Sequence, residues 1–320
     1  MRCRRAPLSE RILLALWHKA RVPVPVETLT GRIDIFHSPD FVLPPMLARA
    51  AVVTIHDLSY VTHPATAHPA QKRFLDAAVP RSVERASRVI AVSEATRGDL
   101  VELYDVPAAK VEVIHNGLDP IFRAPPSEEL LAEVRRRFQL PARFVLAAGT
   151  VQPRKNLPAA AAAVAAIRRR GIDLHLVHFG APGWLCDSVY RDLERLNEGG
   201  FIHLLGPVED RWLPALYSLA GATLAVSLAE GFMFPIVESM AIGTPVVASN
   251  VSSMPEVAGG AALLVDPLSV EEIADAVMRV LGDRSLAAGM RSQGLQRAGT
   301  FTWEKSAERT ESVYLAALET

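Results

Sequence analysis

Short apolar runs alternate with longer helical patterns through the second half of the chain, and this alternation constrains the fold more than any other feature. The apolar runs read as strands over Phe144–Ala148, Leu174–Phe179, Phe201–Leu205, Thr223–Leu228, Pro245–Ala248 and Ala261–Val265. Helical patterns separate them, for example over Leu157–Arg169, Arg211–Ala220 and Val270–Leu281. Strands that alternate with helices in this way pair in parallel and are covered on both faces of the sheet. The second half is therefore predicted to be a complete Rossmann-like α/β domain.

The first half carries fewer elements of the same kind. Its strand-like runs lie at Ile33–Phe36, Val52–Ile55, Val89–Val92 and Val111–Ile114, and its helical patterns at Glu10–Lys19, Ala70–Ala86 and Glu94–Tyr104. Ser93 precedes the last helix and is a residue type that caps helix N-termini. The segment His115–Pro126, with one glycine and three prolines, is predicted to be an interdomain linker.

Size and composition indicate an ordinary globular protein. The chain has 320 residues, enough for two domains with a sizeable core. Half of the residues are apolar and the net charge is −1, so there is no electrostatic case for nucleic-acid binding. Cys3 and Cys186 are the only cysteines, which excludes a disulfide framework. The apolar run Ile12–Trp17 is too short for a membrane span or for the core of a signal peptide.

The segment Glu230–Glu238 reads EGFMFPIVE and joins an apolar run to a helical pattern. Open α/β sheets bind their ligands at such strand–turn–helix junctions. We expect Glu230 at the carboxyl end of the strand and Glu238 about one turn inside the helix that Pro235 opens. N–H groups at a helix start suit a diphosphate, and carboxylate oxygens suit the hydroxyls of a sugar. The alternative, in which Glu230 caps the helix and Glu238 is a solvated helix residue, stays open at this point.

A second junction lies at residues 143–157, which read RFVLAAGTVQPRKNL. Here a predicted strand meets a glycine-containing loop, then Arg154 and Lys155, then an alanine-rich helix. Arginine binds phosphate in bidentate fashion and lysine acts as a point charge, so both side chains are well placed for a phosphate group. A polar loop of the same composition is the plainer interpretation of this segment by itself.

The segments GTVQPRKN, EGFMFPIVESMAIGTPVVAS and SNVSSMPEVAGGAALLVDP resemble, in order and spacing, the GT4-like retaining glycosyltransferases of the GT-B fold. IHDLS, AVSEATRGDL and HNGLDP in the first half, and FTWEKSA near the end, extend the resemblance over most of the chain. It implies two Rossmann-like domains that face a cleft. The implied parts are an acceptor-side domain over 1–122, a nucleotide-sugar-binding domain over 123–300, and a helix over 301–320 that crosses back to the first domain.

The resemblance also implies roles for individual residues. Arg154 and Lys155 match residues that hold the donor diphosphate. Glu230 matches a glutamate near the donor sugar, and Glu238 matches one that binds the ribose hydroxyls. His56 matches a histidine that contacts the sugar, although an isolated histidine is more often a capping or core-edge residue. The implied catalytic residues are His56 and Glu230, and the implied donor contacts are Gly149, Thr150, Arg154, Lys155, Val208, Gly231, Phe232, Met233, Phe234 and Glu238.

The chain departs from the family pattern at three places. Many members have an arginine that binds phosphate at the position of Thr150. A threonine there is typical of the subgroup that reads G-T-x-x-P-R-K-N. Met233 stands where the family usually has glycine; a positive φ there is costly for methionine, and we expect it to shift the donor loop. The chain also begins without the short strand and glycine-rich loop that open these enzymes, which implies a truncated N-terminal domain lacking one or two βα units.

The resemblance implies transfer of a hexose to a hydroxyl acceptor on a glycan or lipid, in cell-envelope polysaccharide synthesis, with no cofactor and no metal. GDP-mannose is the first donor expected, and UDP-sugars stay open. The protein is expected in the cytoplasm, with peripheral membrane contact through the basic helix around Lys72 and Arg81, although an amphipathic core helix explains that pattern more simply. A nucleotide-sugar-binding protein without turnover, a sugar-nucleotide epimerase and a phosphorylase remain alternatives.

Overall fold

The computed structural model describes residues 13, 17 and 22–319, and the chain divides into two compact units. Unit 1 holds residues up to 61 together with 69–115 and 306–320, and unit 2 holds 62–68 and 116–305. The chain passes from one unit to the other after His115, at the start of the predicted linker. Residues 116–122 and 301–305 therefore belong to unit 2, beyond the sequence-based boundaries. The predicted helix Glu10–Lys19 and Cys3 lie almost wholly outside the described residues.

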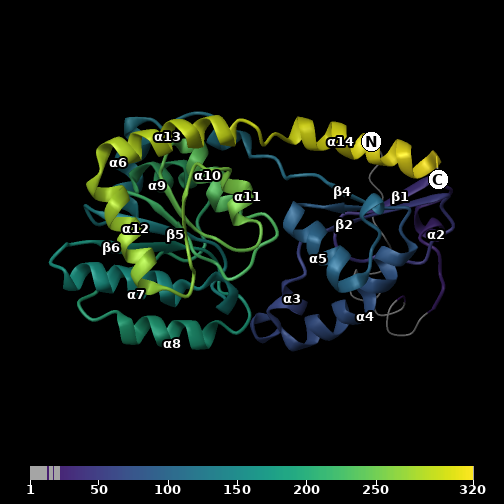
Figure 1. Ribbon diagram of the computed structural model, residues 1–320, viewed down its shortest axis with the longest axis horizontal. Helices are drawn as coiled ribbons and strands as arrows, with labels where there is room; N and C mark the ends of the chain where they lie inside the picture. The colour runs from purple at the N-terminus through teal and green to yellow at the C-terminus, as the bar shows by residue number, and fades with distance from the viewer. Residues whose placement is uncertain (1–12, 14–16, 18–21, 320) are drawn as a thin grey trace. The chain divides into compact units, whose positions relative to one another are not determined.

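The elements are labelled in Figure 1. The strands are β1 (Ile35–Ser38), β2 (Ala50–Ile55), β3 (Arg88–Ala91), β4 (Val111–Val113), β5 (Phe144–Ala148), β6 (His175–Phe179), β7 (Ile202–Leu204), β8 (Thr223–Ala225), β9 (Val246–Ser249) and β10 (Leu263–Val265). The α-helices are α2 (Glu27–Thr30), α3 (Ser59–Thr62), α4 (Pro69–Arg85), α5 (Glu94–Tyr104), α6 (Glu128–Arg137), α7 (Leu157–Arg169), α8 (Cys186–Leu196), α9 (Leu213–Leu219), α10 (Phe234–Ile242), α11 (Met254–Ala258), α12 (Val270–Gly282), α13 (Arg284–Ala298) and α14 (Trp303–Glu319). Short 3₁₀ turns include η4 (Pro120–Phe122), η5 (Pro153–Lys155) and η6 (Asp210–Trp212).

Unit 1 is built on a parallel sheet with the strand order β1-β2-β3-β4. The four strands predicted for this half all form, each within two residues of its expected bounds. Ser93 caps α5, because its Oγ accepts a hydrogen bond from the Thr96 N–H at 3.1 Å, as the sequence predicts. Helix α14 packs Val313 and Ala317 against buried residues of this sheet.

Unit 2 is built on a parallel sheet with the order β10-β9-β8-β5-β6-β7. The chain enters at β5, moves outward through β6 and β7, and then returns to β8 on the other side of β5. Helix α7 packs between α8 and α12 on one side of the sheet, and α9, α10 and α11 lie on the other side (Figure 1). The strand order therefore reverses between β5 and β8, and such a switch point is where open α/β sheets bind ligands.

The strand before the two glutamates is shorter than predicted. The sequence indicates a strand over Thr223–Leu228, but β8 ends at Ala225. The Leu228 N–H donates a hydrogen bond to the carbonyl of Arg154 at 2.9 Å, so the chain leaves the sheet and pairs with the loop after β5. Glu230 consequently lies within a loop and not at the strand end.

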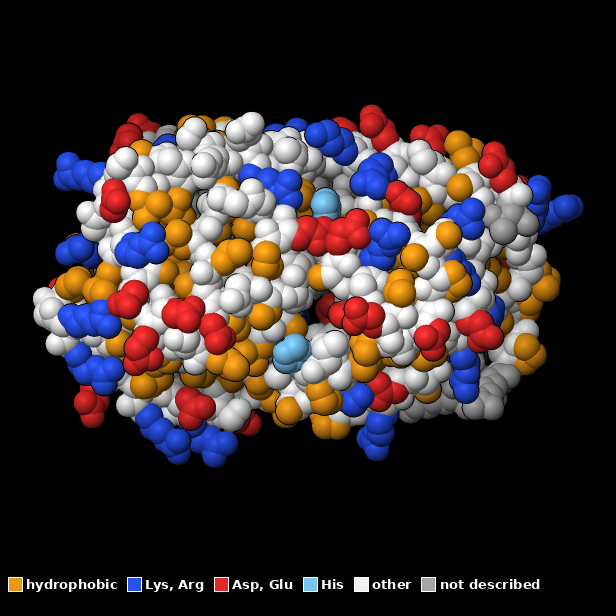
Figure 2. All heavy atoms as spheres, viewed as in Figure 1, with side chains coloured by type: hydrophobic (Ala, Val, Ile, Leu, Met, Phe, Trp, Pro, Cys, Tyr) orange, Lys and Arg blue, Asp and Glu red, His pale blue; other side chains and the backbone are white. Residues whose placement is uncertain are grey.

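Charged side chains of both signs are mixed on the visible face, and no described helix is suited to crossing a membrane. On the face shown in Figure 2, Lys and Arg side chains are interspersed with Asp and Glu side chains. In the part of the chain that the structure describes, no helix combines the length and the apolarity that crossing a bilayer requires.

Candidate functional site

The carboxyl ends of the unit 2 strands meet along one edge, because the strands are all parallel. The loops after β5 and β6 touch there. A Cβ on Gly180 would lie 1.9 Å from the carbonyl oxygen of Gly149, so only glycine fits this contact. Gly149 itself has φ 122°, a conformation that side-chain-bearing residues rarely adopt. Nε2 of His178, in β6, donates a hydrogen bond to the same Gly149 carbonyl at 2.9 Å.

Three of the residues predicted from the sequence meet at the switch point. Nη1 of Arg154 lies 2.8 Å from Oε2 of Glu230, and Nζ of Lys155 lies 2.7 Å from Oε1 of the same carboxylate. The Glu230 side chain is 8% exposed, and those of Arg154 and Lys155 are 11% and 17% exposed. Arg154 also donates from Nη1 to the carbonyl of Ala229 at 2.5 Å. The loop after β5 and the loop after β8 are thus tied together by a largely buried ion triad.

The two cations determine the protonation of Glu230. Burial acts to raise the pKa of this carboxyl, but the attraction and hydrogen bonds of Lys155 and Arg154 together outweigh burial, and the net shift is downward. Glu230 is therefore ionised at neutral pH, and it balances one of the two positive charges.

Glu230 is fixed by its backbone as well as by its side chain. Ser252 Oγ accepts from the Glu230 N–H at 3.1 Å and donates to the Glu230 carbonyl at 2.6 Å, and Ser253 Oγ donates to the same carbonyl at 2.8 Å. These serines lie in the loop after β9. They belong to the SNVSSMPEV segment, which supports the resemblance, but the sequence assigns them no role at the site.

Asn156 is a second residue whose role sequence reasoning missed. It has φ 54°, and it donates from Nδ2 to the carbonyls of Val226 at 3.0 Å and Pro267 at 2.8 Å. Asparagine tolerates this left-handed conformation better than most residues. Asn156 therefore joins the loops that follow β5, β8 and β10, immediately beside the two cations.

Glu238 lies in α10, which begins at Phe234 with Pro235 in its first turn, as the sequence predicts. Its Oε2 accepts a hydrogen bond from the hydroxyl of Tyr217 at 2.6 Å. Burial raises the pKa of Glu238, while the Tyr217 hydrogen bond and the charge of Lys155 oppose that rise. Lys155 thus acts on both glutamates of the predicted pair.

Met233 adopts the conformation that the sequence flags as costly. Its φ is 70° and its ψ is 69°, directly before the first residue of α10, and the residue is 5% exposed. The sulfur lies 3.9 Å from Nζ of Lys155 and 4.0 Å from Oγ of Ser227. The methionine therefore accepts the positive φ of the usual glycine and packs its side chain beneath the cation. The expected shift of this donor loop, relative to the loop in other family members, stays a prediction.

The other residues predicted to contact the donor do not take part in the ion triad. Phe232 is buried and packs edge-to-face against Phe301 and Phe234, and Phe234, at the helix start, is 39% exposed. The γ-methyl of Thr150 occupies space that a Cβ on Gly183 would need. Val208 is half-buried in the loop after β7, and Gly231 is buried beside Glu230; among the described residues neither joins the ion triad.

His56 follows β2 in unit 1, whereas the ion triad belongs to unit 2. Its Nε2 lies 2.9 Å from the carbonyl oxygen of Pro39 and donates a hydrogen bond to it. Its ring packs edge-to-face on Phe41, with 5.7 Å between the centroids. The backbone carbonyl of His56 accepts from Oγ1 of Thr96 at 3.1 Å. These contacts fix the ring; its proposed contact with a sugar stays a prediction.

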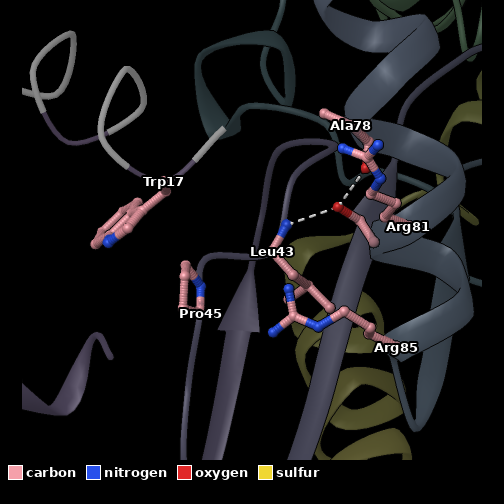
Figure 3. Close-up of a pocket in the computed structure, with 7 residues that line it drawn as sticks. Trp17, Leu43, Pro45, Ala78, Arg81 and Arg85 are labelled. Atoms are coloured by element: carbon pink, nitrogen blue, oxygen red, sulfur yellow. Dashed lines mark hydrogen bonds between the residues drawn. The ribbon is translucent and has the colours of Figure 1, made fainter. Parts of the chain in front are cut away.

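Unit 1 also contains a pocket of about 270 Å³ beside α4 (Figure 3). Its lining residues are Trp17, Leu43, Pro45, Ala78, Arg81, Ser82 and Arg85. Ser82 Oγ accepts from the Leu43 N–H at 3.0 Å and donates to the Ala78 carbonyl at 2.8 Å, which holds one wall together. Arg81 and Arg85 come from the helix for which the sequence predicts membrane contact, and that contact stays a prediction.

The described residues hold no group of three or more His, Cys, Asp or Glu side chains that could bind a metal ion. The positive charges at the switch point are those of Arg154 and Lys155, which suit an anion. The expectation that the reaction needs no metal stays a prediction.

Comparison with known families matches both halves of the chain. The sequence model described as "Glycosyl transferases group 1" matches residues 142–283, and that described as "Glycosyltransferase Family 4" matches residues 2–122. The O-antigen chain mannosyltransferase B of Escherichia coli is 34% identical over 283 residues, which is 88% of this chain and 74% of the relative. The MMP alpha-(1->4)-mannosyltransferase of Mycolicibacterium hassiacum is 28% identical, over 74% of this chain and 56% of its own length.

Solved structures with low sequence identity share the fold. A sucrose-phosphate synthase from Thermosynechococcus elongatus has a TM-score of 0.75 and 22% identity, and the match covers 97% of this chain and 80% of that one. The HepE protein of Anabaena, solved in complex with UDP and glucose, has a TM-score of 0.69 and 20% identity, covering 83% of this chain and 71% of that one. With its two parallel-sheet units and these relatives, the chain belongs to family 4 of the glycosyltransferases and has the GT-B fold.

Proposed function

We propose that this chain transfers a hexose from a nucleoside-diphosphate sugar to a hydroxyl group of a glycan or lipid-linked acceptor, with retention of the anomeric configuration and without a metal ion. The observation that carries the proposal is the convergence of Arg154, Lys155 and Glu230 at the switch point, with Glu238 within the electrostatic reach of Lys155. Two cations and two carboxylates at one edge match the diphosphate and the hydroxyl groups of such a donor.

The proposed reaction requires stabilisation of the nucleoside diphosphate leaving group. The bond between the anomeric carbon and the diphosphate oxygen breaks, and the acceptor oxygen forms the new bond on the same face of the sugar. The acceptor proton passes to the leaving phosphate oxygen, so no strongly basic side chain is needed. Arg154, Lys155 and the amino end of α10 stabilise the charge that develops on the diphosphate, which is the main electrostatic task. Glu230 then hydrogen-bonds the sugar hydroxyls, and Glu238 those of the ribose.

The names of the relatives guide the choice of donor and acceptor. The Escherichia coli relative is an O-antigen chain mannosyltransferase, which supports mannose as the sugar and cell-envelope polysaccharide synthesis as the process. HepE binds UDP and UDP-glucose, which supports a nucleoside diphosphate as the leaving group. GDP-mannose is our first donor, and UDP-glucose is the competitor to test against it.

Calorimetric titration with GDP, UDP, GDP-mannose and UDP-glucose tests the donor site, with and without Mg²⁺. We expect one nucleotide series to bind in the presence of a chelator, and Lys155→Ala to abolish that binding. Arg170→Ala is the matched control, because it removes the exposed ion pair between Arg170 and Asp275 in the same unit. Failure of every nucleotide to bind would overturn the proposed donor site.

Turnover is tested by incubating the donor with and without a mannan-type acceptor and by NMR of the product. Formation of an α-linked product from an α-linked donor supports retaining transfer. Conversion of the donor without an acceptor would indicate an epimerase, and binding with no conversion would indicate a nucleotide-sugar-binding protein. Loss of transfer in EDTA, restored by a divalent cation, would overturn metal independence.

A further inference from the structure

The hydroxyl of Tyr217 makes a short contact with Glu238, one of the two glutamates at the candidate site. Tyr217 lies in α9 and is fully buried, yet its hydroxyl donates to Oε2 of Glu238 at 2.6 Å. A hydrogen bond to an ionised acceptor is shorter and about twice as strong as one between neutral groups. The motif pattern singles out Glu238 and says nothing of Tyr217, because the two residues are brought together only by the packing of α9 against α10.

The position of this hydroxyl is set by several elements. The Tyr217 ring packs edge-to-face against Phe122 of η4 and Phe179 of β6, with 5.9 Å between centroids in both cases. The carbonyl of Tyr217 accepts a hydrogen bond from Oγ1 of Thr244 at 2.7 Å. With its ring and its backbone both held, Tyr217 cannot follow Glu238 if that side chain rotates. The phenol is a fixed point against which the carboxylate is oriented.

The remaining charges around Glu238 make such a fixed point useful. Burial raises the pKa of Glu238, and Asp119 and Asp210 add to that rise, whereas the Tyr217 hydrogen bond and Lys155 lower it. The phenol uses one lone pair of Oε2 and so fixes the direction in which the remaining lone pairs of the carboxylate face a ligand. The pKa of Tyr217 itself is raised well above its ordinary value by burial and by Glu238, so the phenol remains a donor at all working pH values.

We propose that Tyr217 is a positioning residue that orients the carboxylate of Glu238 toward the ribose hydroxyls of the donor, and so gives the site its preference for ribonucleotides over deoxyribonucleotides. This inference rests on the proposed function, in which Glu238 binds the ribose. A purely structural Tyr217 would contribute to stability alone, so nucleotide discrimination separates the two roles.

The test compares GDP with 2′-deoxy-GDP and 3′-deoxy-GDP by calorimetry, or the UDP series if uridine proves to be the base. We expect the wild-type protein to bind at least one deoxy analogue about tenfold more weakly than the ribonucleotide, because a hydrogen bond to a charged acceptor is lost. Tyr217→Phe keeps the ring packing and should reduce that ratio to about threefold or less, mainly by weakening the ribonucleotide. Tyr60→Phe is the control, because it removes another tyrosine hydroxyl bond, that to Tyr104 at 3.0 Å, in unit 1. It should keep the wild-type ratio.

The outcomes distinguish the inference from the function on which it rests. A wild-type protein that binds none of the nucleotides overturns the proposed donor site. A wild-type protein that binds ribo- and deoxyribonucleotides equally overturns the ribose role of Glu238 and this inference with it. A Tyr217→Phe protein that is folded and keeps the wild-type ratio overturns the inference alone.

If Tyr217→Phe does not fold, 3-fluorotyrosine introduced at position 217 preserves the packing and makes the phenol a stronger donor. The stronger hydrogen bond should bring the raised pKa of Glu238 down and move the acid limb of ribonucleotide binding to lower pH. An acid limb that stays at the wild-type pH would overturn the inference.

Discussion

Oε1 of Glu230 lies 2.7 Å from Nζ of Lys155, so a carboxylate predicted to bind sugar neutralises a cation predicted to bind phosphate. A diphosphate that binds Lys155 and Arg154 competes with this carboxylate. We therefore expect Glu230→Gln to bind GDP or UDP about tenfold more tightly than the wild type, which corresponds to about 1.4 kcal/mol. Transfer should nevertheless slow by roughly 10²-fold, because a contact to the reacting sugar is lost.

Calorimetry and an initial-rate assay on Glu230→Gln measure the two effects separately. Glu209→Gln is a suitable control, since Glu209 is exposed and forms an ion pair with exposed Arg211 at 3.1 Å. Weaker nucleotide binding by Glu230→Gln would show that Glu230 organises the two cations for phosphate and does not compete with it.

His178 should make the stability of unit 2 depend on pH. Its pKa is lowered from 6.5 to about 4 chiefly by burial, with the hydrogen bond to Gly149 opposing and the charge of Lys155 adding to the shift. Between these two values the unfolded chain binds the proton and the folded chain does not, so the free energy of unfolding falls as pH decreases from 6.5 toward 4. The loss from this residue amounts to at most about 3.4 kcal/mol, from a shift of about 2.5 pKa units at about 1.36 kcal/mol each.

Urea unfolding at several pH values measures this slope. His178→Gln, which keeps a donor for the Gly149 carbonyl, should flatten the curve between pH 6.5 and 4. An equal slope in the His178→Gln protein would contradict the assignment.

Met233 combines an unfavourable backbone with a favourable side chain. Its φ of 70° costs a non-glycine residue about 1–2 kcal/mol, which Met233→Gly would recover. Removing the buried side chain costs more, about 2–5 kcal/mol for a methionine cut back in a core. We expect Met233→Gly to be less stable by a net of roughly 1–3 kcal/mol.

Denaturant midpoints with an unchanged slope provide the measurement. Met233→Leu retains the volume and should lose less than about 1.5 kcal/mol. A Met233→Gly protein more stable than the wild type would mean that backbone strain outweighs packing at this position.

His56 and the ion triad lie in different units, so their effects should separate in kinetics. His56→Ala should leave the affinity for GDP or UDP unchanged, because the proposed donor contacts all come from unit 2. The transfer rate should fall by roughly 10²-fold if the ring contacts the sugar as charge develops. A rate within twofold of the wild type would remove His56 from the catalytic set.

The periodicity of the sequence determined most of the secondary structure. The strand over Phe144–Ala148 and the helices over Leu157–Arg169 and Glu94–Tyr104 form with the bounds expected, because their apolar patterns and end residues are local signals. The predicted strand through Leu228 is wrong beyond Ala225, because a bond to the distant Arg154 carbonyl competes with the sheet. Local patterns carry no information about such long-range partners.

The candidate site also combines residues that the sequence predicts with contacts that only the tertiary structure shows. Arg154, Lys155, Glu230 and Glu238 are visible in the sequence because their residue types and spacing match a strand–loop–helix junction. That the first three form one ion triad, that Ser252 fixes the backbone of Glu230, and that Tyr217 holds Glu238 were decided by the tertiary structure alone. The physical reason is the parallel sheet, which brings the carboxyl ends of β5, β8 and β9 to one edge although long stretches of chain separate them.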